Sequence, residues 1–177
     1  MRGKSVIDVQ TYPIERRILL YVLVEFLAYW IISSFVWIPW VFAEWMGMLA
    51  MLVLAPLITA FATLYCLNKT SINVWRKEIW LIICAFLATS AILDYFFWVT
   101  WRGHKILEWY LPISRVGVGN FIGYVEMVIA SLLTLVIALR SSRLQRISFF
   151  NRFDEKLVAI FGVLFFLFTL YCAFTYW

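Results

Sequence analysis

The feature that most constrains this chain is a series of five apolar segments, each long enough to cross a bilayer as a helix. A hydrocarbon core of about 30 Å takes roughly 20 helical residues. The segments cover about 18–40, 43–66, 79–101, 117–140 and 156–177 of the 177 residues. Because little chain is left between them, we expect one transmembrane domain, an all-α integral membrane protein built as a five-transmembrane-helix bundle.

The composition agrees with this prediction and excludes several other classes of protein. The chain is 65% apolar and 14% charged, whereas a soluble domain is about 45–50% apolar and about 25% charged. The three cysteines form no CxxC or CxxH motif, which argues against a cysteine metal or redox site. We interpret the net charge of +5 as a topology signal and a match to anionic lipid, with no nucleic-acid partner.

The lysines and arginines predict how the bundle is oriented. Twelve of the 15 flank the side of the predicted spans that holds the N-terminus, and only Arg102, Lys105 and Arg115 lie on the other side. By the positive-inside rule, we expect a multi-pass protein of the cell membrane with a cytoplasmic N-terminus and a C-terminus outside.

Two connecting segments are predicted to be interfacial helices. Residues 102–116 mix polar and apolar side chains and carry Trp109, which is typical of the outer interface. Residues 140–156 combine phenylalanines with four arginines, Arg140, Arg143, Arg146 and Arg152. We expect this second segment to rest on anionic headgroups at the inner interface, with a protein-docking site as the alternative.

Three carboxylates lie inside the predicted spans: Glu25, Asp94 and Glu126. A charge at the centre of a span costs roughly 2.5–3.5 kcal/mol on insertion scales, so such residues usually face the bundle interior and serve a function. Asp94 and Glu126 lie seven and nine residues from the outer ends of their spans, so we expect them at similar depth. The pair would share a proton, a cation or a polar ligand. Alternatively, each is neutral and hydrogen-bonded to a nearby Tyr, Ser or carbonyl group.

The neighbours of this pair suggest a pocket that opens outward between the third and fourth spans. Gly119 and Gly123 form a GxxxG motif on the face of Glu126, which predicts close contact with another helix or a second copy of the chain. Asp94 shares a helical face with two tryptophans. The predicted lining is Asp94, Glu126, Glu25, Asn120, Tyr124, Trp98, Trp101 and Trp109.

His104 and Glu108 are weak candidates for a metal site. If residues 102–111 are helical, the two side chains share a face at a spacing that metal ligands use. A single interfacial histidine beside Arg102 and Lys105 is more often simply solvated, so we assign no metal and no cofactor.

These observations favour a protein that binds or transports a small molecule, an ion or a lipid in the predicted pocket. One alternative is an intramembrane enzyme acting on a lipid or isoprenoid, with Asp94, Glu126, His104 and Glu108 as acid, base or metal ligands. Another is an accessory subunit of a larger membrane complex, which would dock through the Gly119 and Gly123 face and the basic 140–156 segment.

Overall fold

In a computed structural model, the protein is all-helical over the residues described, which are 13–146 and 155–176. The side chains of residues 37, 40–42, 44, 146 and 176 are not described. The long elements are α1 (Ile14–Phe42), α2 (Glu44–Asn68), α3 (Trp75–Asp94), α5 (Arg115–Arg140) and α6 (Glu155–Tyr176). The short elements are η1 (Ile72–Val74), the π-helix η2 (Tyr95–Trp101), α4 (Ile106–Tyr110) and η3 (Leu144–Arg146). The prediction of five membrane-length helices is confirmed.

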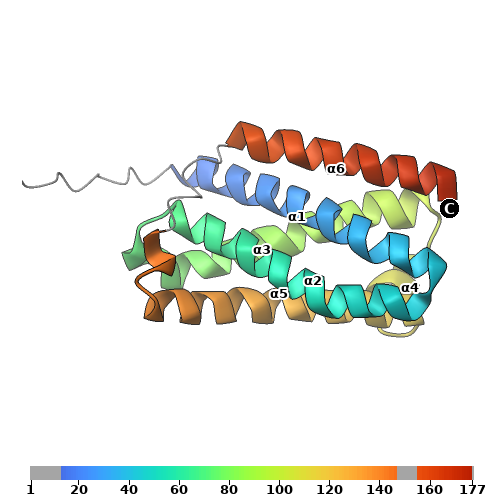
Figure 1. Cartoon of the computed structure of the whole chain (residues 1–177), viewed down its shortest axis with the longest axis horizontal. Coiled ribbons are helices and arrows are strands. Elements are labelled where there is room, and N and C mark those ends of the chain that lie inside the picture. The colour runs from blue at the N-terminus through green and yellow to red at the C-terminus, as the bar shows by residue number, and fades with distance from the viewer. Residues whose placement is uncertain (1–12, 147–154, 177) are drawn as a thin grey trace, which may run out of the picture.

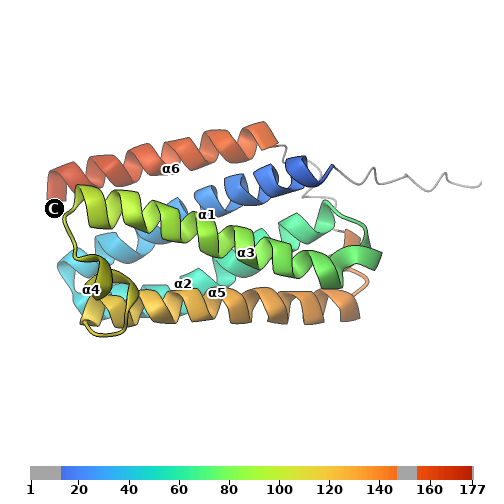
Figure 2. The ribbon, with the colours of Figure 1, turned by 180° about the vertical axis from the view of Figure 1, so that it is seen from behind.

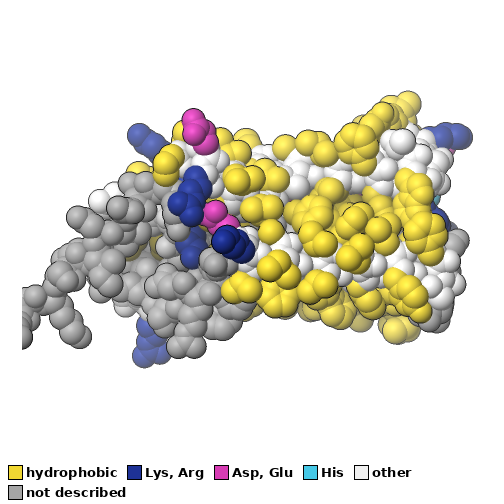
Figure 3. All heavy atoms as spheres, turned by 90° about the horizontal axis from the view of Figure 1, so that it is seen from above, with side chains coloured by type: hydrophobic (Ala, Val, Ile, Leu, Met, Phe, Trp, Pro, Cys, Tyr) yellow, Lys and Arg dark blue, Asp and Glu magenta, His cyan; other side chains and the backbone are white. Residues whose placement is uncertain are grey.

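The five long helices carry candidate membrane spans, which cover 14–36, 45–68, 72–101, 115–140 and 155–175. On the face seen in Figure 3, hydrophobic side chains cover the middle of the molecule, and the visible Lys and Arg side chains lie towards its two ends, most of them at one end. An apolar band of this kind is stable in hydrocarbon and unfavourable in water, so the chain is a polytopic membrane protein.

The long helices run side by side along one axis, and α1 occupies the centre of the bundle (Figures 1 and 2). It packs against α2, α3 and α6, whereas α5 packs against α2 and α3 on the far side. Helix α6 packs mainly on α1. Gly162 permits this close approach, because a Cβ atom there would lie 2.8 Å from the ring of Phe26.

The turn between α1 and α2 is a single extended residue, Ala43, whose N–H donates to the carbonyl of Pro39 at 2.9 Å. A turn this short makes the two helices antiparallel neighbours. At the same end of the bundle lies α4, which is part of the segment that connects α3 to α5 (Figure 1).

The first predicted interfacial helix is shorter than expected, and only part of the second lies among the described residues. Between Trp101 and the start of α5 at Arg115, only Ile106–Tyr110 is helical, and the chain turns at Gly103, whose φ of +75° lies in the region that favours glycine. Within 140–156, α5 ends at Arg140 and a short 3₁₀ turn follows at Leu144–Arg146. The remainder, residues 147–154, lies outside the described residues.

The core has two apolar parts along the bundle axis. One is centred on buried residues such as Leu20, Trp75 and Phe86, and the other is aromatic and includes Trp30, Phe97 and Trp98. On α3, the polar residues Ser90 and Asp94 fall between Phe86 and the aromatic part. These two polar residues therefore lie between two apolar clusters.

Candidate functional site

A cavity of about 100 Å³ lies between α1, α2, α3 and α5, where the two apolar parts of the core separate. Its polar lining consists of Glu25, Tyr29, Ser33, Thr59, Ser90, Asp94, Asn120 and Tyr124. The rest of the lining is apolar or glycine, and none of the lining residues that the structure describes is Lys, Arg or His. The site therefore combines acidic and neutral polar groups without a basic one.

Asp94 is the most fully hydrogen-bonded acid in the cavity. The hydroxyl of Tyr29 donates to its Oδ1 at 2.6 Å, and the hydroxyl of Tyr124 donates to its Oδ2. Trp98 in turn donates its indole N–H to the Tyr29 oxygen at 2.9 Å. Both carboxylate oxygens of this side chain, which is only 7% exposed, therefore accept a hydrogen bond from a phenol.

Glu25 is satisfied less completely. Its Oε1 accepts from the hydroxyl of Ser90 at 2.6 Å, while its Oε2 is buried without a hydrogen-bond partner. The residue is 1% exposed and lies in the middle of the span 14–36. A buried carboxylate oxygen without a donor is costly and calls for a proton or a ligand.

The structure places Glu25, not Glu126, beside the same cavity as Asp94. Glu126 is partly exposed, its Oε2 also lacks a partner, and it does not belong to the cavity lining. On α5, Tyr124 and Met127 point into the cavity instead. The site is thus formed by four helices, including α1 and α2, whereas the sequence suggested a pocket between the third and fourth spans alone.

The sequence also indicates that Glu25 lies near Asp94, although pairing the acids by their depth in the spans did not use this pattern. Polar residues recur every four positions along α1 at Arg17, Tyr21, Glu25, Tyr29 and Ser33. Residues four apart lie on one face of a helix. This spacing marks a polar stripe that includes Glu25 and the tyrosine that holds Asp94.

Gly119 and Gly123 pack inside the chain. Ideal Cβ atoms at these positions would lie 4.0 and 3.9 Å from the side chain of Met51 on α2. Both glycines also line the cavity. Their small size therefore contributes to the space beside Asp94.

Trp98 and Trp109 support the site without lining the cavity. Their rings stack at 5.4 Å with an interplanar angle of 16°, and the two side chains are 3% and 1% exposed. Asn120, which does line the cavity, donates to the carbonyl of Trp109 at 3.2 Å. These contacts connect the α4 end of the bundle to the polar groups around Asp94.

Trp101 lies away from the cavity and is 42% exposed. In a regular α-helix it would share the face of Asp94, seven residues earlier. The π-helix η2 begins at Tyr95 and has more residues per turn, which rotates Trp101 away from that face. Its ring contacts Phe97 and Phe174 instead.

His104 and Glu108 do not share a helical face, because α4 begins only at Ile106. Glu108 pairs with Lys105 at 3.1 Å, whereas the ring of His104 packs 4.9 Å from that of Trp109. Partial burial, together with the charge of Arg102, lowers the pKa of His104 below its usual 6.5. Within the described part of the chain, no three or more His, Cys, Asp or Glu side chains form a metal-binding group.

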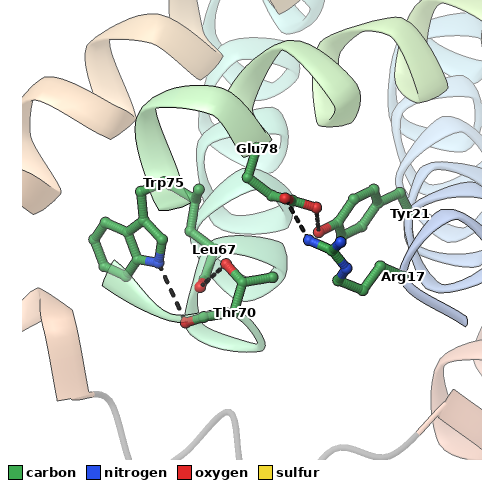
Figure 4. Close-up of polar contacts among 6 residues, drawn as sticks. All are labelled: Arg17, Tyr21, Leu67, Thr70, Trp75 and Glu78. Atoms are coloured by element: carbon green, nitrogen blue, oxygen red, sulfur yellow. Dashed lines mark hydrogen bonds and ion pairs between the residues drawn. The ribbon is translucent and has the colours of Figure 1, made fainter. Parts of the chain in front are cut away.

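A second polar cluster joins α1 to α3 near the other end of the bundle (Figure 4). Glu78 accepts from Arg17 at 2.5 Å and from the hydroxyl of Tyr21 at 2.6 Å. The side chains of Arg17 and Glu78 are 17% and 7% exposed. This acid is neutralised by a basic residue of the same chain, which distinguishes it from the acids of the cavity.

Comparisons with protein-family models, with curated proteins and with solved structures give no match. The functional argument therefore depends on the geometry of the cavity.

Proposed function

We propose that this polytopic membrane protein binds a small polar ligand or an ion in the cavity between α1, α2, α3 and α5, or transports it across the bilayer. The observation that carries the proposal is the convergence of two buried acids, Glu25 and Asp94, on one cavity, where none of the described lining residues is basic. Acids at this depth are expensive, and a bound ligand that needs them accounts for their presence.

The size of the cavity favours a very small ligand. A water molecule takes about 30 Å³ in the liquid, so about 100 Å³ holds an ion with a few waters or a small polar molecule. Pockets for drug-sized ligands are about 300–1,000 Å³. This difference argues against a drug-sized ligand enclosed in this cavity.

The orientation and the membrane partner are also proposals. The charge asymmetry supports a cytoplasmic N-terminus in the cell membrane, which would place the cavity in the outer half of the bundle. Anionic headgroups would contact the arginines of residues 140–156. Docking through Gly119 and Gly123 has less support, because these glycines pack against α2.

A thermal-shift screen with the Asp94→Asn variant tests the proposed binding. Purified protein in detergent is heated with inorganic ions and small polar compounds. A ligand at 100 times its Kd adds about 2.7 kcal/mol of stability, which raises Tm by about 5–11 °C in a chain of this length. We expect Asp94→Asn to lose this shift.

Glu126→Gln is the matched control, because it removes a membrane carboxylate that lies outside the cavity lining. We expect it to keep the full shift. Equal stabilisation of wild type and Asp94→Asn by the same compound would show that the cavity is not the binding site.

A further inference from the structure

We infer that the ligand of the cavity is a monovalent cation, and that it binds in exchange for a proton on Glu25. This inference rests on the proposed binding function and names its ligand class. It starts from the different ways in which the two cavity acids are satisfied.

Glu25 is the acid that holds the exchangeable proton. Asp94 accepts hydrogen bonds at both oxygens, from Tyr29 and Tyr124, and these bonds stabilise its ionised form. Glu25 accepts only from Ser90, and its Oε2 has no partner. An ionised carboxylate in this position would be buried with a hydrogen bond at only one of its two oxygens, so the group is protonated and neutral instead. The proton of the neutral acid is therefore on Oε2, the oxygen without a partner, in a residue that lines the cavity.

The chemistry of the cavity wall selects a hard cation as the species that displaces this proton. Besides the two acids, Ser33, Thr59 and Asn120 bring neutral oxygen atoms to the lining. Oxygen ligands suit hard cations. An anion would meet two acids and no basic side chain among the lining residues described, so it is disfavoured.

The charge balance selects a monovalent ion. Each oxygen of Asp94 already accepts a hydrogen bond from a phenol, so among the two cavity acids only Glu25 has a carboxylate oxygen without a hydrogen-bond partner. Ca²⁺ takes 6–8 oxygen ligands, usually including several carboxylates. Within the described residues, no cluster of three or more acidic, His or Cys side chains provides such a set.

The exchange leaves the net charge of the cavity unchanged. The O–H bond of Glu25 breaks, its electron pair stays on Oε2 and coordinates the entering cation, and the proton leaves to water. Among the described residues, Cys66 on α2, Asp94 on α3 and Tyr124 on α5 interact electrostatically with Glu25, and none of these three is basic. From α6, the other neighbour of α1, the apolar residues Phe166 and Leu170 pack near this part of the helix.

Proton release on cation addition tests the exchange directly. The full chain in detergent, in weak buffer with a pH-sensitive dye, receives LiCl, NaCl or KCl, with choline chloride to control for ionic strength. We expect one of the three cations to release about one proton per protein in a saturable way. Glu25→Gln should release none, whereas Glu126→Gln should behave as wild type.

The variant Ser90→Ala keeps the test decisive if Glu25→Gln does not fold. Ser90→Ala removes the one hydroxyl that stabilises ionised Glu25, so proton release should need a higher pH or more cation. Unchanged release in Ser90→Ala, or full release in a folded Glu25→Gln protein, would overturn the assignment to Glu25.

The same measurements separate this inference from the proposed function. A cation or neutral compound that stabilises wild type but not Asp94→Asn, and releases no proton, would disprove the exchange and leave the binding function standing. If no compound gives an Asp94-dependent shift and no cation releases a proton, both are wrong.

Discussion

The contact between Arg17 and Glu78 predicts an unequal cost for removing its two members. Glu78 is 7% exposed and depends on Arg17 and Tyr21 for its hydrogen bonds. In Arg17→Gln the acid stays buried with Tyr21 as its remaining donor. In Glu78→Gln, the arginine keeps its charge on a long side chain, which can reach the headgroups, and glutamine still provides an acceptor.

The expected magnitudes follow from burial. Leaving one charge of a buried pair uncompensated costs about 3–5 kcal/mol. Tyr21 and the partial exposure of Arg17 reduce this cost to about 3 kcal/mol for Arg17→Gln. We expect about 1 kcal/mol for Glu78→Gln, the typical net value of a hydrogen bond. At about 2–4 °C per kcal/mol, Arg17→Gln should lower Tm by about 6–12 °C.

Thermal unfolding in detergent, followed by tryptophan fluorescence, measures these differences. Arg16→Gln is the matched control, because Arg16 is the neighbouring residue and its contact with Glu155 joins side chains that are 54% and 25% exposed. It should cost less than about 1 kcal/mol. The double variant should cost less than the sum of the single ones. The reasoning is refuted if Glu78→Gln costs as much as Arg17→Gln, or if Arg17→Gln costs no more than Arg16→Gln.

Two further predictions concern the α4 end of the bundle. In Gly117→Ala, the added Cβ would lie 2.0 Å from the carbonyl oxygen of Leu111, so we expect a loss of about 1–3 kcal/mol or more in the same unfolding assay; Gly123→Ala, where the nearest atom lies at 3.9 Å, should be tolerated. Because folding lowers the pKa of His104, its imidazole binds a proton more readily in the unfolded chain than in the folded one. The free energy of unfolding should therefore fall as the pH drops below about 6.5 towards the pKa of the folded state. His104→Phe should reduce this dependence on pH while keeping an aromatic ring against Trp109, and an unchanged Tm-against-pH profile would contradict the assignment.

The membrane architecture could be predicted from sequence because hydrocarbon imposes a length and a polarity on each span. The expected spans and the observed long helices agree to within a few residues at most ends. The difference at the start of the first span changes the depth of Glu25. The prediction began the first span at residue 18, which put Glu25 about 10 Å from the cytoplasmic end, whereas α1 begins at Ile14 and adds about 6 Å of depth. Glu25 thereby moves to the middle of the span 14–36.

The grouping of the acids could not be predicted from depth alone. Counting residues gives the height of a side chain along its helix, and it does not give the direction in which the helix turns that side chain. Asp94 and Glu126 were matched by height, but packing directs Gly123 and Met127 of α5 towards the cavity and leaves Glu126 outside its lining. The π-helix after Asp94 likewise has no simple sequence signal, and it changes which tryptophans lie near the acid.

The two acidic clusters of this chain provide a comparison that bears on the proposed function. Near the end of the bundle, Glu78 has an arginine and a tyrosine from α1 as partners, which is how a purely structural acid is satisfied here. In the cavity, Glu25 and Asp94 receive only neutral donors, although both clusters join α1 to α3. An arginine in the cavity would pair with the acids permanently. The described lining contains no such arginine, so a proton or a cation from solution can neutralise the acids instead. This arrangement is consistent with the proposed binding site.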